Sequence, residues 1–353
     1  MVAVSVIMPI YNVADGLKKS IQSFLNQTYR DFELILVNDG STDDSGNICD
    51  EFKKTDSRIQ VIHQENAGSG LARNAGLDRA AGEYIYFADP DDYVEIELIK
   101  DNLKIAKEND ANVVVFGYYL EEINTKGKRI KTTHLPKLSV LKTKEDFRKS
   151  FRAFRSLDSN VLWNKFYRHQ YLVENNCRFT DQRVGQDALF NHLVYQNLED
   201  IYFNQKPYYH YVSRIGSAVN HYHPDRFLLE YTIAEHFEKL ITIWHYEQVY
   251  QDLISLAYWR TLYVELNNLI LEDCPLSDYE KKQKISSALH HPKIQQILFS
   301  STSSLEKKHH IKLLTFLLKN NKYSLTLKIM RAKIQISKRY YYTFNTLKKI
   351  VGT

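Results

Sequence analysis

The sequence has 353 residues, 44% of them hydrophobic, and a formal net charge of +5, so it can bury one large core or two modest ones. Its three cysteines lie far apart in no metal-like spacing, so they argue against a disulfide framework and indicate a reducing compartment. The N-terminus has no signal-peptide pattern and no apolar run approaches the roughly 18 residues of a membrane span, so we expect a cytoplasmic protein that is not transmembrane.

Short apolar runs alternate with helical patterns over the first 120 residues. The expected strands are Val4–Ile10, Phe32–Val37, Ile59–His63, Tyr84–Ala88 and Asn112–Tyr118. The expected helices between them are Asp15–Asn26, Asp43–Thr55, Ser69–Ala80 and Glu95–Asn109. This alternation predicts an α/β fold with a mostly parallel sheet and helices on both faces. Ligands of such sheets bind at the carboxyl ends of the strands.

The remaining chain becomes progressively helical. Asn124–Lys142 is polar and basic and predicts a loop or hairpin, and helical patterns return at Lys144–Arg155 and Gly185–Gln196. From about Phe227 the pattern is almost wholly helical, and no Pro/Gly/Ser-rich linker marks a boundary. We therefore expect two domains, a sheet-containing domain at 1–225 and a helical C-terminal region at 226–353.

Three carboxylates follow the strand that ends near Ala88, in the run Asp89-Pro90-Asp91-Asp92. Such neighbours repel one another, and they cannot all be buried unless a cation lies among them. A divalent cation with oxygen ligands, Mn²⁺ or Mg²⁺, is the natural partner and would in turn bind a diphosphate. The alternative is a solvated acidic turn before a helix.

Four further motifs accompany this acidic run in order: Val4–Asn12, Val37–Ser45, Asn66–Gly68 and Ala72–Gly76. Together they resemble bacterial-type, UDP-sugar-dependent family 2 glycosyltransferases over about residues 1–220. The resemblance implies the Rossmann-like GT-A fold and transfer of a sugar from a nucleotide donor. It does not specify the sugar or the acceptor.

The resemblance places the nucleotide around Asp39. A carboxylate there can accept a hydrogen bond from the N3–H of uracil, a proton that cytosine lacks, and this favours a UDP donor. The family's equivalents of Pro9 and Tyr11 line the base pocket, and Asn66 belongs to the same donor site. The alternatives are that Asp39 simply begins a turn with Gly40 and that Tyr11 packs in the core.

The resemblance also implies contacts to the rest of the donor. Arg73 would reach the ribose or the phosphates, unless it is an ordinary surface arginine. Asp89 would bind the ribose and support the metal, and Asp91 would be the direct metal ligand. The role of Asp92 is less defined, and it could orient the site.

A general base for the acceptor hydroxyl is expected at the start of the helix that begins near Gly185. The family usually has a Glu-Asp pair here, whereas this sequence has Gln186-Asp187. We predict that Asp187 is the base, with a first-turn acid that balances the helix dipole as the alternative. The substitution at Gln186 puts in doubt any role of the family's Glu in holding the acceptor.

Two later segments match family loops near the diphosphate and the acceptor. In the first, Trp163, Asn164 and Lys165 could present a ring face and donors to a sugar, although core packing is an equal alternative for Trp163. In the second, Arg214 and Ser217 lie in a loop whose basic residue can close over the diphosphate.

The function that the resemblance implies is metal-dependent, inverting transfer from a UDP-sugar to an acceptor hydroxyl. It would serve the synthesis of a bacterial polysaccharide, cell-surface glycan or protein glycan, with a lipid-linked or protein-linked acceptor. One alternative, a nucleotidyltransferase that forms nucleotide sugars, would show a Gly-rich basic loop after the first strand, and Tyr11–Gly16 is not one. The other is a non-catalytic nucleotide-sugar or glycan-binding module, against which Asp91 and Asp187 argue.

The charge is distributed unevenly along the chain. Residues 307–353 contain twelve Lys or Arg and no Asp or Glu, which leaves residues 1–306 with a net charge of −7. This basic tail could lie on an anionic membrane, form a solvated or oligomer-forming helix, or bind nucleic acid. The aromatic residues Tyr340–Tyr342 and Phe344 favour the membrane. We therefore expect a cytoplasmic protein, peripheral at the inner face of the cell membrane, with no nucleic-acid partner.

Overall fold

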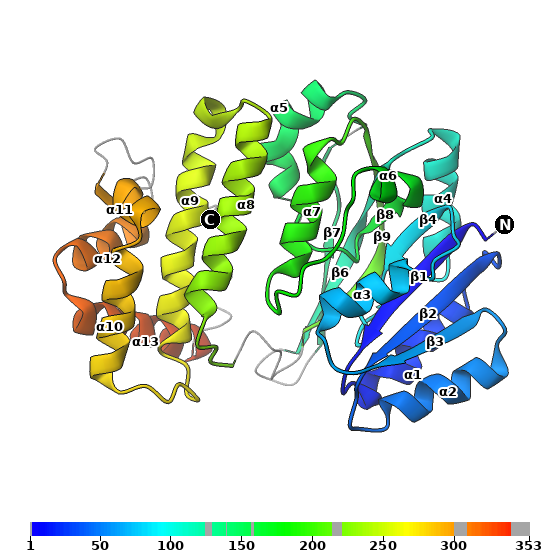
Figure 1. Ribbon diagram of the computed structural model, residues 1–353, viewed down its shortest axis with the longest axis horizontal. Coiled ribbons are helices and arrows are strands. Elements are labelled where there is room, and N and C mark those ends of the chain that lie inside the picture. The colour runs from blue at the N-terminus through cyan, green and yellow to red at the C-terminus, as the bar shows by residue number, and fades with distance from the viewer. Residues whose placement is uncertain are drawn as a thin grey trace. The chain divides into compact units, whose positions relative to one another are not determined.

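The computed structural model describes residues 2–123, 129–138, 140–156, 159–213, 221–299 and 309–339. The chain divides into two compact units, Met1–Arg214 and Ile215–Thr353. In Figure 1 the first unit combines a sheet with helices, whereas the second is helical. The predicted fold class, an α/β domain followed by a helical region, is confirmed. The boundary expected after residue 225 stays a prediction.

The first unit is built on a nine-stranded sheet with the strand order β3-β2-β1-β4-β8-β6-β9-β5, in which β7 pairs with β6. The first four strands in this order are parallel, whereas β8 runs antiparallel to both β4 and β6. The expectation of a mostly parallel sheet thus holds for one half, and the other half is mixed. The strands are β1 (Val4–Ile10), β2 (Phe32–Asp39), β3 (Ile59–Gln64), β4 (Tyr84–Phe87), β5 (Tyr93–Val94), β6 (Val113–Ile123), β7 (Arg129–His134), β8 (Lys165–Arg168) and β9 (Ile201–Val212).

Helices cover both faces of this sheet, because successive residues of a buried strand point to opposite sides. Along β1, Val6 and Met8 share a buried core with residues of α1 and α4. Ile7 points the other way, towards α3, where a Cβ on Gly76 would overlap the Ile7 side chain. The helices of this unit are α1 (Ala14–Leu25), α2 (Ser45–Thr55), α3 (Ser69–Leu77), α4 (Leu98–Glu108), α5 (Lys144–Arg155), α6 (His169–Glu174) and α7 (Gln186–Gln196).

A cluster of three phenylalanines fixes α7 against the sheet. Phe87 of β4 makes edge contacts with Phe179 at 5.2 Å and with Phe190 of α7 at 5.5 Å, measured between ring centroids. Phe179 and Phe190 stack on each other at 4.1 Å. Buried aromatic rings contribute both apolar area and specific geometry, so this cluster determines where the first turn of α7 lies.

The strand directions bring several chain segments to one edge of the sheet. β6 and β9 run in the same direction as β4, since β8 is antiparallel to both β4 and β6. The carboxyl ends of β1, β2, β4, β6 and β9 therefore share an edge, and β8 begins at that edge. This is the edge at which the sequence places the candidate site.

The described residues of the second unit form a pair of long helices, α8 and α9, and four shorter ones. Its core includes Tyr231 of α8 and Tyr258 of α9, whose ring centroids are 5.3 Å apart. Among the described residues, no helix is long and apolar enough to cross a membrane. The helices are α8 (Arg226–Ile243), α9 (Glu247–Asn268), α10 (Asp278–Leu289), α11 (Pro292–Phe299), α12 (His309–Lys319) and α13 (Tyr323–Arg339).

Candidate active site

Asp39, the last residue of β2, anchors the loop that follows β3. The residue is buried, with 2% of its surface exposed. Its Oδ1 accepts hydrogen bonds from Nε2 of Gln64 at 2.7 Å and from the Ala67 amide at 2.9 Å, and its Oδ2 accepts one from the Gly68 amide at 2.8 Å. A carboxylate has about four acceptor positions, so these three bonds leave capacity for one more donor.

Gly40 lets this loop lie directly on the end of β2. Its φ angle is +72°, and a Cβ at this position would lie 2.8 Å from the backbone nitrogen of Asn66. Any other residue here would be strained and would displace the loop. Asn66 itself is exposed next to the bonds that hold the loop to Asp39.

Asn12 joins the loops that follow β1 and β2, a role that the sequence analysis did not assign. Its Oδ1 accepts hydrogen bonds from the amides of Thr42 at 2.8 Å and Asp43 at 3.3 Å, and its own amide donates to Oγ of Ser41 at 3.2 Å. The φ angle of Asn12 is +50°, a conformation that asparagine adopts more readily than most residues. An asparagine two residues after the end of a strand is therefore the signal that could have identified it.

The structure separates the two residues predicted to line the base pocket. Pro9 is buried within β1, in register with Val37. Tyr11 lies just beyond the strand and is 48% exposed. Of the two, Tyr11 therefore offers the larger surface to a ligand, and its exposure does not favour the core-packing alternative.

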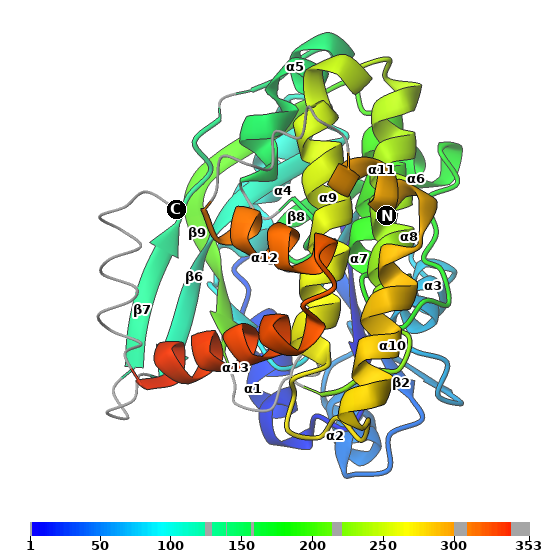
Figure 2. The same cartoon turned by 90° about the vertical axis from the view of Figure 1, so that its left-hand side faces the viewer.

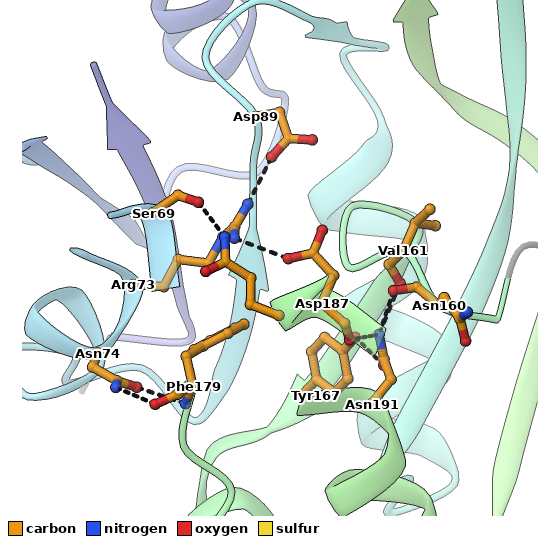
Figure 3. A network of polar contacts seen from close by, with 11 residues as sticks. Ser69, Arg73, Asn74, Asp89, Asn160, Val161, Tyr167, Phe179, Asp187 and Asn191 are labelled. Carbon is orange, nitrogen blue, oxygen red and sulfur yellow. Dashed lines mark hydrogen bonds and ion pairs between the residues drawn. The ribbon is translucent and has the colours of Figure 1, made fainter. Parts of the chain in front are cut away.

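Arg73 lies between two of the predicted carboxylates (Figure 3). Its Nη1 donates a hydrogen bond to Oδ1 of Asp187 and its Nη2 donates one to Oδ1 of Asp89, each at 3.0 Å. Arg73 is only 4% exposed, so it is not an ordinary surface arginine. Three residues predicted for the donor, the metal and the base thus meet in one ion-paired network.

Burial and the charges of neighbouring carboxylates raise the pKa values of two of these aspartates, Asp89 and Asp92. Partial burial raises the pKa of Asp89 to about 6; the positive charge of Arg73 opposes this shift, and the negative charges of Asp187 and Asp91 add to it. Burial, followed by the charge of Asp91, raises the pKa of Asp92 to about 8. Burial is the larger cause in both cases, and repulsion between the carboxylates adds to it.

Asp92 connects this cluster to β9. Its Oδ2 accepts a hydrogen bond from the Tyr209 hydroxyl at 2.5 Å, and its Oδ1 accepts one from the Val212 amide at 2.8 Å. Between these two positions, His210 lies within hydrogen-bond distance of Glu95 at 2.9 Å and Glu121 at 2.7 Å. The end of β9 thus holds the turn that contains Asp89 and Asp91. No prediction from the sequence covered this strand.

Asp187 occupies the first turn of α7, where the positive end of the helix dipole favours a carboxylate. Asn191, one turn later, is fully buried. Its Nδ2 donates to the Asp187 carbonyl at 2.9 Å and to the Asn160 carbonyl at 3.0 Å, as Figure 3 shows. Asn191 therefore fixes the first turn of α7 to the segment that precedes β8.

Gln186, the neighbour of the predicted base, contacts the start of α3. Its Nε2 donates a hydrogen bond to Oγ of Ser69, at the start of α3. The residue is 7% exposed. Where the family usually has a glutamate, this chain thus has a neutral link between α7 and α3.

Residues of the Trp163-Asn164-Lys165 segment are buried at the start of β8. Trp163 stacks on Tyr209 at 4.4 Å between ring centroids and is 6% exposed. The Lys165 ammonium donates to the Val161 carbonyl at 2.6 Å and to Oδ1 of Asn164 at 2.7 Å. This packing favours the core alternative for Trp163. Arg214 and Ser217 lie outside the described residues.

The carboxylates at the end of β4 fit a hard divalent cation. Within the described ranges, no group of three or more His, Cys, Asp or Glu side chains is arranged to hold a metal ion. Mg²⁺ and similar ions are often bound by only one or two carboxylates, with the phosphates of a ligand completing the coordination. Asp91 and Asp89 are suited to that mode, because their mutual repulsion would be relieved by a cation.

Comparison with known sequences identifies the family of the N-terminal segment. The family model described as Glycosyl transferase family 2 matches residues 5–174. This segment is a family 2 glycosyltransferase domain. The prediction made from the motifs is thus confirmed, and the matched segment contains Asp39, Arg73, Asp89 and Asp91 but ends before Asp187.

Curated relatives match part of the chain. Glycosyltransferase GlyA of Streptococcus pneumoniae is 33% identical over 221 residues, which cover 61% of this chain and 31% of GlyA. The uncharacterized glycosyltransferase EpsJ of Bacillus subtilis is 34% identical over 203 residues, 56% of this chain and 57% of EpsJ. The chain therefore spans less than two thirds of the length of either relative.

Among solved structures, the fold resembles that of Staphylococcus aureus TarS. Residues 1–349 of TarS, in complex with UDP-GlcNAc, superpose with a TM-score of 0.63 at 19% sequence identity, covering 94% of this chain and 92% of that one. At this identity the likeness concerns the fold. It includes the helical region that follows the family 2 domain.

Proposed function

We propose that this protein transfers a sugar from a UDP-sugar to an acceptor hydroxyl, with inversion at the anomeric carbon and with the help of Mn²⁺ or Mg²⁺. The observation that carries the proposal is the Arg73 network, which brings Asp89 and Asp187 to the carboxyl edge of a family 2 glycosyltransferase sheet. The activity would belong to the synthesis of a bacterial polysaccharide, cell-surface glycan or protein glycan.

The donor nucleotide is proposed to lie over the ends of β1 and β2. Asp39 has capacity for one more hydrogen bond and would accept the uracil N3–H, and exposed Tyr11 would contact the base. The other predicted donor-site residues remain Pro9, Asn66, Arg73 and Asp89. The complex of TarS with UDP-GlcNAc supports a UDP-sugar as the donor.

Asp91, supported by Asp89, is proposed to hold the divalent cation. When bound there, the cation would supply Lewis-acid stabilisation of the negative charge that collects on the departing diphosphate. The hydrogen bonds from Tyr209 and Val212 of β9 to Asp92 would keep these carboxylates in place as the donor binds. Arg214 and Ser217 stay predicted contacts to the diphosphate or the acceptor, and so do the buried Asn164 and Lys165.

The chemical step that we propose uses Asp187 as general base. Arg73 engages Oδ1 of Asp187, and we assign Oδ2 to the acceptor. Asp187 removes the proton of the acceptor hydroxyl as that oxygen bonds to the anomeric carbon, while the bond from that carbon to the diphosphate oxygen breaks and UDP leaves with the electron pair. A single displacement converts an α-linked donor into a β-linked product.

The acceptor and the location are proposed from charge. The twelve Lys or Arg and no Asp or Glu of residues 307–353 would seat the enzyme on the anionic inner face of the cell membrane, near a lipid-linked acceptor. A protein-linked acceptor and oligomerisation through the C-terminal helices are the other proposals for this region.

A donor screen tests the proposed reaction. The full-length protein is incubated with UDP-Glc, UDP-Gal, UDP-GlcNAc and UDP-GalNAc and with GDP- and CMP-sugars, with Mn²⁺ or Mg²⁺, and nucleotide release is measured. We expect one UDP-sugar to be turned over, and the anomeric configuration of the product by NMR to be opposite to that of the donor. Turnover of a GDP- or CMP-sugar alone would contradict the role of Asp39, and retention would contradict single displacement.

A further inference from the structure

Helix α12 exposes apolar side chains between lysines. Its buried side consists of Ile311, Leu314, Leu317 and Leu318, each at most 5% exposed. Its outer side carries Leu313, 47% exposed, and Phe316, 61% exposed. Lys312 and Lys319 are exposed on the same side, since residues three, four and seven apart share one helix face. Figure 2 shows α12 on the side of the second unit that faces the viewer.

Phe299, at the end of α11, extends this surface. It is 63% exposed. The Lys319 ammonium lies 5.4 Å from the centroid of its ring, which brings Phe299 next to the outer side of α12. We call Phe299, Lys312, Leu313, Phe316 and Lys319 the α12 face. Single exposed apolar residues are common on protein surfaces, but three large ones gathered around two lysines require an explanation.

The surrounding charge indicates what would cover the α12 face. Two further lysines, Lys322 and Lys328, are exposed on or just before α13. No acidic residue occurs after Glu306. An apolar strip bordered by lysines, whose long side chains can extend their charge outward, is the pattern of helices that lie in a membrane interface.

We propose that the α12 face inserts Leu313, Phe316 and Phe299 into the headgroup region of an anionic bilayer. The proposal rests on the membrane location proposed above and deepens it. The basic tail would bind the membrane through charge, whereas the α12 face would add apolar binding free energy that salt does not screen. A second copy of this chain fits less well. A two-fold contact places the same patch on both partners, so Lys312 and Lys319 would face their own copies.

Vesicle flotation tests the insertion. The full-length protein and the double variant Leu313→Ser/Phe316→Ser are compared on phosphatidylcholine vesicles with and without phosphatidylglycerol. The matched control is Leu228→Ser/Val249→Ser, at positions 53% and 58% exposed on α8 and α9 of the same unit. We expect the α12 variant to partition about tenfold more weakly and the control to be unchanged. In 1 M salt, residual binding should persist for the native protein and the control alone.

Phe316→Trp gives a direct readout of depth. We expect its fluorescence to shift to the blue on addition of anionic vesicles and to be quenched by brominated lipid. Equal binding of all variants, or an unshifted Phe316→Trp, would overturn the proposal. If the native protein self-associates without lipid and the α12 variant does not, the face binds a second copy of the chain instead. If the native protein binds an oligonucleotide in a salt-sensitive way, the face binds nucleic acid instead.

Enzyme assays separate this proposal from the proposed function. In a reaction with a soluble acceptor, the α12 variant should release UDP from the donor at the native rate. If the native protein inserts into vesicles but turns over no UDP-sugar, the proposed function is wrong and the proposal for the α12 face is supported. If UDP is released normally while no form of the protein inserts, the reverse holds.

Discussion

The guanidinium of Arg73 lies 3.0 Å from Oδ1 of Asp187, although the two residues are 114 positions apart in the sequence. The same side chain also pairs with Asp89. Arg73 comes from α3 and Asp187 from α7, so this contact joins the half of the site proposed for the donor to the proposed base. A planar guanidinium suits this bridge, because it can direct separate N–H groups to two carboxylates.

Arg73→Gln should impair both stability and turnover. Breaking a fully buried ion pair costs about 3–5 kcal/mol, and we expect about half of that here, since the side chains of Asp89 and Asp187 are 28% and 35% exposed. The kcat for UDP-sugar turnover should fall more than the KM rises. Urea unfolding and steady-state kinetics measure the two effects.

Arg178→Gln is the control for that variant. Arg178 pairs with Asp78 at the surface, where the two side chains are 46% and 57% exposed, so its loss should cost between about 0 and 1 kcal/mol. If Arg73→Gln is as stable and active as Arg178→Gln, Arg73 does not hold the network together.

Asp187→Asn should lower kcat by about 10²–10⁴-fold with little change in UDP affinity. The amide is similar in size but cannot take the acceptor proton, and the contact of Asn191 with the Asp187 backbone carbonyl is kept. UDP affinity is measured by calorimetry and kcat by product formation. Loss of UDP binding with an unchanged kcat for the bound donor would instead place Asp187 in the donor site.

The sequence alone predicted the elements whose signals are local. The alternation of apolar strands and helices located β1 to β4 and α1 to α4 within a few residues, and the acidic run marked the end of β4. Within Asn124–Lys142, where a loop or hairpin was expected, Arg129–His134 forms β7, which pairs with β6. These features depend on residues close together in the chain, so periodicity and strand-end residues suffice to find them.

Contacts between distant segments could not be predicted in this way. Nothing in the pattern around Arg73 shows that Asp187 would lie beside it, because that depends on how Phe179 and Phe190 pack against β4. Likewise, Asp92 meets Tyr209 only because β5 pairs with β9. The strands β8 and β9 were not assigned, since β8 has four residues and β9 contains Pro207 and a register shift opposite it.

Removal of the divalent cation should abolish turnover. The proposed metal site relies on Asp91 with support from Asp89, so EDTA should stop UDP release and added Mn²⁺ or Mg²⁺ should restore it. Asp91→Asn should be nearly inactive while its circular dichroism and melting temperature stay native. Asp44→Asn, at an exposed carboxylate that contacts Asn47, is the control and should retain activity. Full activity in EDTA would refute the metal-dependent mechanism.

Gly40→Ala should weaken UDP binding more than it affects the acceptor side. The φ angle of +72° is unfavourable for alanine by roughly 1–2 kcal/mol, and the added Cβ would lie 2.8 Å from the backbone nitrogen of Asn66. The loop must therefore move away from β2, which would break the hydrogen bonds from the Ala67 and Gly68 amides to Asp39.

We expect the Kd for UDP to increase at least about tenfold in Gly40→Ala, because a loss of about 1.4 kcal/mol in binding free energy is enough for that factor. Gly46→Ala is the matched control. It lies in α2, and its Cβ would lie 3.0 Å from the end of the Asn38 side chain and 4.0 Å from the His63 ring, with no backbone atom as close. Calorimetry with UDP gives both values, and equal affinities for the two variants would show that the loop after β3 does not form part of the nucleotide site.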